Sequence, residues 1–186
     1  MSMPSPATLW TVEMLHGLPE DGNRYEIIGG DLYVTPSPTR GHERIAKRIG
    51  QLLDAYIAGE RLAAEVFAND ADIKRDEHTL VQPDVLVIDA TREIDHSSWP
   101  PMRSLLLAVE VLSPSTSRRD RTTKRALYLG EGVEYWIADP DMRTIERWHP
   151  ATMQSEVLRT ELRWHPSSAR HPLVVRVPAL FEPPTF

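Results

Sequence analysis

The chain has 186 residues, of which 41% are hydrophobic and 26% are charged, and these proportions are typical of a globular domain with one buried core. Its formal net charge of −6 argues against a protein that coats nucleic acid nonspecifically, because such proteins are usually basic, but it leaves room for a local basic site. The absence of cysteine excludes disulfides, thiolate chemistry and zinc–cysteine clusters.

No segment of the sequence predicts a membrane span or an export signal. No run of apolar residues reaches the ~18 that a transmembrane helix needs. Residues 1–6 lack the basic start and the apolar core of a secretory signal. We therefore expect a cytoplasmic protein without a membrane partner. We expect residues 1–8 to form a flexible tail and residues 9–186 to form a single domain.

A short helix and a hairpin are the first predicted elements. Thr11 is a suitable N-cap for a helix that ends before Gly17. Two strands are predicted at residues 25–28 and 31–34, joined by a Gly-Gly pair that can supply the positive φ of a tight turn. A longer helix is predicted over residues 41–58, where one apolar stripe is formed by Ile45, Ile49, Leu52, Leu53 and Tyr56.

The rest of the chain predicts a sheet and a second long helix. A strand is expected over residues 62–73, a polar loop over residues 89–104, and a helix over residues 118–129 that stops at Gly130. Short apolar runs predict further strands at residues 82–88, 105–112, 134–138, 144–149 and 173–177. The predicted fold class is therefore mixed α/β, a central sheet with one helix before the acidic strands and one after.

Two acidic residues lie in the apolar runs of two predicted strands. Asp84 precedes the run 85–88, and Glu110 lies 26 positions further on, within the run 105–112. Burying a lone carboxylate is costly unless it is paired or bound to a metal. Carboxylates brought together on adjacent strands supply the oxygen ligands that Mg²⁺ prefers. The pair therefore predicts a Mg²⁺ site, in which Mn²⁺ may substitute.

A lysine on the following predicted helix is expected to face these acids. Lys124, Leu127 and Tyr128 are spaced i, i+3 and i+4, so they share one face of the helix. Because Leu127 and Tyr128 are expected in the core, Lys124 is turned toward the sheet. Two carboxylates and one inward lysine suit metal-dependent phosphodiester hydrolysis, in which the metal activates water and the lysine stabilises developing charge or orients that water.

Five segments of the chain match, in order, the motifs of a known family. They contain R-Y-E-I-I with G-D-L (residues 24–32), Q-P-D-V (82–85), V-E-V-L-S-P-S-T (109–116), Asp120 with Lys124 and Tyr128, and G-V-E-Y-W with D-P (132–140). On these motifs the chain resembles the PD-(D/E)xK nucleases, and most closely the Uma family of putative restriction endonucleases, over roughly residues 8–150.

The resemblance implies a restriction-endonuclease-like fold, a mixed β-sheet flanked by α-helices with the site at one sheet edge. It implies that Asp84 and Glu110 are catalytic acids and metal ligands, and that the backbone carbonyl of Val111 is a third ligand. The broad superfamily motif has a lysine where this chain has Leu112. In the Uma family that lysine has moved to the following helix, and Lys124 is its match as the third catalytic residue.

Further residues are assigned supporting roles. Glu26 would be an extra acid at the metal, or a strand-face carboxylate paired with Arg24 or Arg44. His42 matches a position where the family often has histidine, and it would contact phosphate or make a hydrogen bond at the helix start. Three arginines adjoin the predicted site and are expected to bind nucleic acid, unless they form a solvated helix face: Arg118, Arg119 and Arg121.

Three functions from different classes fit these observations. The leading hypothesis is a Mg²⁺-dependent endonuclease that hydrolyses phosphodiester bonds in DNA. The first alternative is a non-cleaving module on a nuclease-like fold that binds nucleic acid or protein, which the negative net charge and Leu112 favour. The second alternative is a metal-dependent hydrolase of a small phosphate ester. A homodimer is expected for the nuclease, because paired sites would cut both strands.

Overall fold

The structure is a computed structural model that describes residues 9–69, 71–91 and 100–183. The tail predicted over residues 1–8 lies outside the described residues. The helical segments are α1 (Val12–Leu15), α2 (Arg40–Glu60), the 3₁₀ turn η1 (Met102–Ser104), α3 (Ser117–Arg119), the π-helical turn η2 (Asp120–Lys124), α4 (Arg125–Gly130) and α5 (Val177–Leu180).

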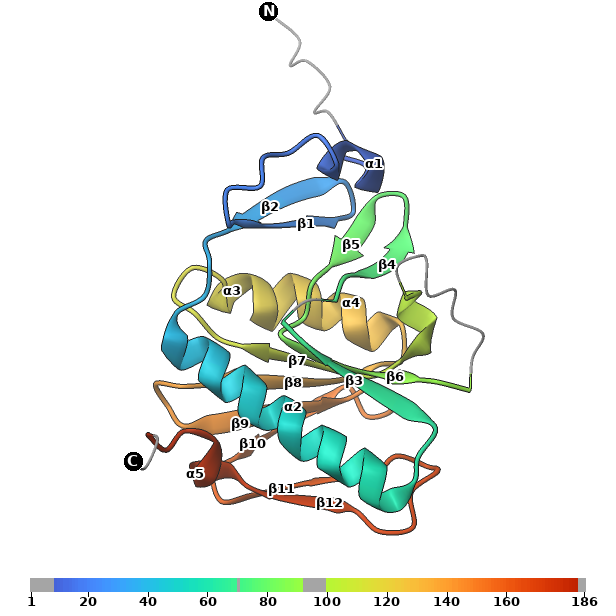
Figure 1. Ribbon diagram of the computed structural model, residues 1–186, viewed down its shortest axis with the longest axis vertical. Coiled ribbons are helices and arrows are strands. Elements are labelled where there is room, and N and C mark those ends of the chain that lie inside the picture. The colour runs from blue at the N-terminus through green and yellow to red at the C-terminus, as the bar shows by residue number, and fades with distance from the viewer. Residues whose placement is uncertain (1–8, 70, 92–99, 184–186) are drawn as a thin grey trace, which may run out of the picture.

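The strands of the described residues form three sheets (Figure 1). The central sheet has six strands in the order β10-β9-β8-β7-β6-β3, a second sheet has four in the order β2-β1-β5-β4, and β11 pairs with β12. Their bounds are β1 (Arg24–Ile28), β2 (Asp31–Thr35), β3 (Ala64–Ala68), β4 (Ile73–Asp76), β5 (Thr79–Val81), β6 (Val85–Asp89), β7 (Leu105–Val111), β8 (Glu134–Asp139), β9 (Thr144–His149), β10 (Gln154–Leu158), β11 (Glu161–Trp164) and β12 (Leu173–Arg176).

The central sheet is mixed, as predicted. β7 and β8 run parallel, whereas β3–β6, β6–β7, β8–β9 and β9–β10 pair antiparallel. Parallel neighbours need a crossover connection, which here is the continuous helical segment α3–η2–α4. The predicted strand containing Asp84 and the strand containing Glu110 are therefore direct neighbours in the middle of the sheet.

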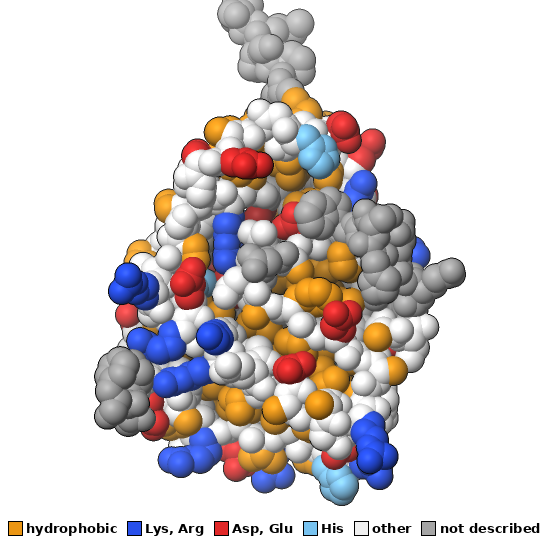
Figure 2. All heavy atoms as spheres, viewed as in Figure 1, with side chains coloured by type: hydrophobic (Ala, Val, Ile, Leu, Met, Phe, Trp, Pro, Cys, Tyr) orange, Lys and Arg blue, Asp and Glu red, His pale blue; other side chains and the backbone are white. Residues whose placement is uncertain are grey.

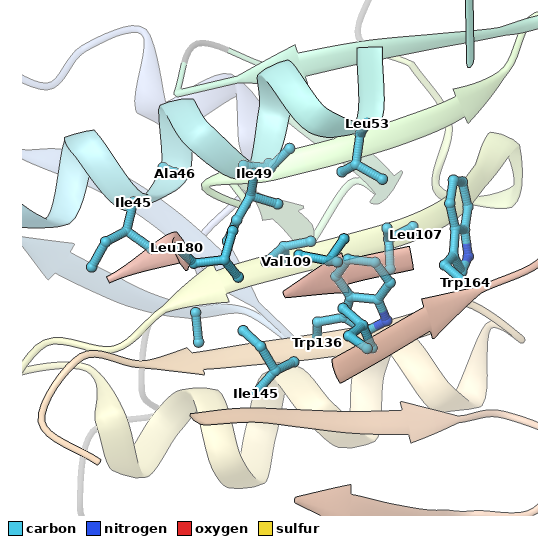
Figure 3. Packing of buried hydrophobic residues seen from close by; sticks show 14 of the residues in the cluster. Ile45, Ala46, Ile49, Leu53, Leu107, Val109, Trp136, Ile145, Trp164 and Leu180 are labelled. Carbon is cyan, nitrogen blue, oxygen red and sulfur yellow. The ribbon is translucent and has the colours of Figure 1, made fainter. Parts of the chain in front are cut away.

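Apolar side chains cover both faces of the central sheet. One face packs against α2, the β11–β12 pair and α5, with Trp136 and Trp164 edge to face at a centroid distance of 6.1 Å (Figure 3). The other face packs against α4 and the β4–β5 hairpin, through residues such as Leu86, Leu127 and Tyr128. Burial of both faces explains why β6 and β7 have continuous apolar runs rather than an alternating pattern.

Helix α2 confirms the predicted apolar stripe at Ile45, Ile49 and Leu53, whereas the prediction is wrong for Leu52, which is exposed, and Tyr56 is only partly buried. Its N-cap is Thr39, whose hydroxyl accepts a hydrogen bond from the His42 N–H, and it ends at Arg61, which adopts a left-handed conformation with φ 56°. Its buried stripe consists of Ile45, Ala46, Ile49, Gly50, Leu53 and Ile57. In the stripe Gly50 allows close approach, because a Cβ there would lie 3.2 Å from the Cβ of Ala68 on β3.

The second sheet contains the predicted hairpin. β1 and β2 are joined through Gly29 and Gly30, whose φ values of 61° and 87° confirm the turn. The prediction of one strand over residues 62–73 is wrong. β3 ends at Ala68, and Asn69, with φ 72°, takes the chain out of the central sheet toward β4 in the second sheet. None of the helices in residues 9–69, 71–91 and 100–183 is long and apolar enough to cross a membrane.

Neighbouring leucines on α2 provide a test of this packing. We expect Leu53→Ala to lower the free energy of unfolding by about 2–5 kcal/mol, because Leu53 is fully buried and its truncation leaves a cavity. Leu52→Ala is the matched control: Leu52 is 41% exposed, and its loss should cost less than about 1 kcal/mol. Urea denaturation followed by circular dichroism measures both. Equal losses would contradict the orientation of α2.

Candidate functional site

A cavity of about 700 Å³ lies where the central and second sheets meet. Its walls come from β1, the N-terminal turn of α2, the C-terminal end of β7, the loop 112–117 and the loop after β8. The site therefore lies at the edge of the central sheet where β7 and β8 end and β6 begins. Eight of the nine predicted site residues line this cavity, all except Arg118: Glu26, His42, Asp84, Glu110, Val111, Arg119, Arg121 and Lys124.

The alternation of β7 explains why Glu110 meets the crossover helix. Ala108, Glu110 and Leu112 are two residues apart, so their side chains point to the same face. Ala108 and Leu112 pack in the cluster that includes Leu127 of α4. Glu110 consequently faces the helix, whereas Val109 and Val111 face α2. Leu112, at the superfamily lysine position, is a core residue that is 8% exposed.

Lys124 is buried between carboxylates. Its Nζ lies 2.8 Å from Glu110 Oε1 and 2.7 Å from Glu26 Oε1, and 3.9 Å from Asp120 Oδ1. Burial opposes the charged form, but the three carboxylates outweigh it and raise the pKa of Lys124 above its ordinary value. Lys124 is therefore an ammonium at neutral pH, which suits charge stabilisation and not proton abstraction.

Burial acts on Glu110 in the opposite direction, because it raises the pKa of a carboxyl group. Complete burial raises the pKa of Glu110 well above its ordinary value; the charge of Lys124 opposes this, and the nearby charges of Asp120, Asp84 and Glu26 add to it. Its hydrogen bonds within the described residues all end on Oε1, from Lys124 Nζ at 2.8 Å and the Tyr128 hydroxyl at 3.4 Å. Oε2 thus has a lone-pair capacity that these neighbours do not use.

Asp84 is held by two side chains and one backbone amide. Arg24 Nη1 lies 2.6 Å from Oδ1, and His42 Nε2 lies 3.0 Å from Oδ2. The backbone N–H of Val111 also donates to Oδ2, at 2.8 Å, which ties Asp84 to the strand that bears Glu110. Burial raises the pKa of Asp84, but the His42 hydrogen bond, the Val111 hydrogen bond and the Arg24 charge lower it below its ordinary value.

Glu26 belongs to the buried network, and its cationic partners are Lys124 and Arg119 rather than Arg24 or Arg44. Its Oε1 accepts the backbone N–H of Gln82 at 2.9 Å as well as Lys124. Its Oε2 lies 3.2 Å from Arg119 Nη2. Arg119 in turn donates to Thr35 Oγ1 at 2.8 Å. The second sheet thus contributes one acid to the cavity, from the middle of β1.

Two residues of the site were not predicted from the sequence. Arg24 is the ion-pair partner of Asp84, and no local pattern links positions 60 residues apart. Asp120 is 1% exposed, and neither of its carboxylate oxygens has a hydrogen-bond partner among the described residues. Burial raises the pKa of Asp120. Its sequence signal was available, because Asp120 and Lys124 are four residues apart on one predicted helix.

The predicted nucleic-acid-binding arginines differ in their surroundings. Arg118 is exposed beside the cavity. Arg119 is engaged with Glu26, and Arg121 bridges Asp139 and Glu146 at 2.8 and 2.7 Å. Figure 2 shows further Lys and Arg side chains near the N-terminal half of α2, where Arg48 donates to the backbone carbonyls of Ala179, Leu180 and Glu182.

The donor set suits a hard cation. Within the described ranges, no three histidine or acidic side chains are arranged as a ready-made metal site. Cations hold the acids in place instead, Lys124 on Glu110 and Arg24 on Asp84. Carboxylate oxygens and a backbone carbonyl are nevertheless the ligands that Mg²⁺ prefers, and the free Oε2 of Glu110 is one of them. Asp84, Glu110 and Val111 all line the cavity.

The mixed sheet flanked by helices, with acids at the ends of its inner strands and one lysine on the crossover helix, defines a restriction-endonuclease-like protein. The family model Uma2, described as "Putative restriction endonuclease", matches residues 12–175, and the chain belongs to this family. A crystal structure of a putative nuclease belonging to DUF820 from Anabaena variabilis has a similar fold. It gives a TM-score of 0.74 at 22% identity, over 92% of this chain and 97% of that one. No curated protein matches the sequence.

A second, smaller cavity adjoins the site on the other side of β1. It measures about 250 Å³, and Arg24 and Gln82 border both cavities. Asp72 lines it. Burial, together with the charge of Glu26, raises the pKa of Asp72 to about 6, against the opposing effects of Gln82 and Arg24. Asp72 therefore titrates near neutral pH, and its pKa depends on the charge of Glu26.

Replacement of Asp72 should change how stability depends on pH. A carboxyl group whose pKa is raised on folding stabilises the folded state only while it is protonated, so the wild type should lose stability between pH 4 and pH 6. We expect Asp72→Asn to be more stable than the wild type by roughly 1–3 kcal/mol above pH 6.5, and the difference to disappear near pH 4. Thermal unfolding at several pH values measures this. The exposed Asp54→Asn is the control, and a constant difference across the range would contradict the assignment.

Proposed function

We propose that the protein is a Mg²⁺-dependent endonuclease that hydrolyses phosphodiester bonds in DNA. One observation carries the proposal: Asp84, Glu110 and Lys124 come from three different parts of the chain and converge on one cavity. Membership of a restriction endonuclease family and the nuclease-like fold support the same reaction class. DNA as the substrate follows from the family description.

Asp84, Glu110 and the carbonyl of Val111 would hold the metal ion. When bound, Mg²⁺ or Mn²⁺ polarises the phosphate and lowers the pKa of a coordinated water. Asp84 suits this task because its lowered pKa keeps it ionised. The hydrogen bond from the Val111 N–H to Asp84 fixes the separation of the two strands that bear the acids. Because ligands must be deprotonated, and burial raises the pKa of Glu110, metal binding would compete with protonation of this carboxylate.

Lys124, Glu26 and His42 complete the proposed site. The ammonium of Lys124 stabilises the charge that develops on the phosphate or orients the attacking water. Glu26 holds that ammonium from the second sheet. His42, with Nε2 on Asp84, orients the carboxylate from the start of α2. A homodimer would place two such sites on one duplex, so that both strands are cut.

Cleavage of plasmid DNA tests the proposal. We expect nicking and linearisation in Mg²⁺ or Mn²⁺ that EDTA abolishes. Asp84→Asn, Glu110→Gln and Lys124→Gln should each reduce the rate by about 100-fold or more, the scale on which loss of one electrostatic stabiliser acts. Single-stranded, linear and RNA substrates in the same assay define the substrate class.

The exposed Glu65→Gln is the matched control, because Glu65 lies on the outer strand β3 away from the cavity. Full activity of Asp84→Asn would contradict the proposed metal ligand. DNA binding without any product, unchanged in Asp84→Asn, would identify the non-cleaving binding module instead. Cleavage of a small phosphodiester without affinity for DNA would identify a small-ester hydrolase.

The exposed arginine beside the cavity should contribute to DNA affinity. We expect Arg118→Gln to weaken binding and to reduce the slope of log affinity against log salt by about 1, the value for one lost phosphate contact. Fluorescence anisotropy with a labelled duplex at several salt concentrations measures this. Arg103→Gln is the control, because Arg103 is exposed at the opposite end of β7. Equal slopes for both variants would show that Arg118 does not contact the DNA backbone.

A further inference from the structure

Lys124 and Asp120 both lie on the π-helical turn η2, but only Lys124 makes close ion pairs. The ammonium of Lys124 makes close contacts with Glu26 and Glu110, at 2.7 and 2.8 Å, and stands 3.9 Å from Asp120 Oδ1. Both carboxylate oxygens of Asp120 are buried without a hydrogen-bond partner among the described residues. An unpartnered buried carboxylate is costly, so its presence calls for a state in which it is satisfied.

The arrangement of Lys124 conflicts with a metal ion on the same acid. An ammonium and a divalent cation that both bind Glu110 would repel each other at the few ångströms that separate them, because Lys124 and Glu110 are buried and solvent screens their charges little. A metal ion on Oε2 of Glu110 therefore favours withdrawal of the ammonium from Oε1. The nearest unsatisfied anionic group is Asp120, one helical turn away and already within 3.9 Å.

We propose that Asp120 is a positioning residue that receives the Lys124 ammonium when a divalent cation occupies the acidic site. This inference rests on the metal-dependent function proposed above. Lys124 then has two positions: against Glu110 without metal, where it neutralises the acids, and against Asp120 with metal, where it remains beside the cavity. The ammonium already stands 3.9 Å from Asp120 Oδ1, and the π-helical turn that holds both residues is a feature frequently found at functional sites.

The neighbours of Asp120 support a docking role. The Tyr135 hydroxyl donates to the backbone carbonyl of Asp120 at 3.2 Å, not to its carboxylate. The Tyr128 hydroxyl reaches Glu110 instead. The two tyrosine hydroxyls thus leave the side-chain oxygens of Asp120 open to Lys124, with Thr116 as the other nearby donor, while the backbone of the turn is anchored to β8 through Tyr135.

A double-mutant cycle on metal affinity tests the inference. Mn²⁺ binding is measured by calorimetry for the wild type, Asp120→Asn, Lys124→Gln and the double variant. Asp120→Asn removes the alternative partner of Lys124, and we expect it to weaken binding about tenfold or more, the range of residues that act through a metal ligand's surroundings. Lys124→Gln removes the competitor and should bind Mn²⁺ at least as tightly as the wild type. In the Lys124→Gln background, Asp120→Asn should have no effect.

Lysine spectra give a second readout on the unmodified chain. The protein has three lysines, Lys47, Lys74 and Lys124, and Lys47 and Lys74 are exposed. With ¹³Cε-labelled lysine, titration of diamagnetic Mg²⁺ should move the Lys124 resonance to a new position and leave the other two in place. Asp120→Asn should abolish or reduce that movement, and the exposed Asp54→Asn should not. The wild-type titration remains decisive even if Asp120→Asn does not fold.

The outcomes separate this inference from the proposed function. A wild type that binds neither Mn²⁺ nor Mg²⁺ would overturn the metal-dependent function itself. Binding with an unmoved Lys124 resonance, or equal loss of affinity from Asp120→Asn with and without Lys124, would overturn the role of Asp120 alone. The latter result would show that Asp120 acts on the metal directly or on the fold.

Discussion

The ammonium of Lys124, shared by Glu26 and Glu110, is the interaction on which the rest of the site depends. It joins β1 of the second sheet, β7 of the central sheet and the crossover helix at one point. A buried charge of this kind is tolerated only with well-placed partners, and removal of one partner leaves the others uncompensated. The two sheets are thus held together across the cavity by charge, where an apolar contact would close the space that a substrate needs.

Asp84 is likewise held by groups from several elements. Arg24 approaches from β1, His42 from α2 and the Val111 amide from β7. Glu26, Asp84 and Glu110 are thereby each matched by a cation or an amide from another element. These pairs offset the cost of burying several acids in one fold. The cations that hold the acids are side chains of the protein itself. Under the proposed function, a divalent ion would therefore compete with these internal cations for the carboxylates.

The sequence was informative wherever a pattern was local. The apolar runs identified Asp84 and Glu110 as unusual, and the spacing of Lys124 with Leu127 and Tyr128 correctly turned the lysine toward the sheet. Patterns failed where pairing is long-range. The partnership of Arg24 with Asp84 and that of Arg119 with Glu26 leave no local trace. The break at Asn69 was missed because its left-handed conformation is set by the passage between two sheets, and β10 is almost wholly exposed and lacks an apolar alternation.

The parallel pairing of β7 with β8 has a consequence for how the chain tolerates change in length. Glu110 is fixed by the pairing of β7, whereas Lys124 is fixed by its position along the crossover helix, so the number of residues between them sets the angle at which the lysine projects. One residue added or removed turns a helical side chain by about 100°. The wide π-helical turn already accommodates an additional residue within this connection. Relatives that share the chemistry should therefore vary in length in the loops outside this segment, while its count of residues stays constant.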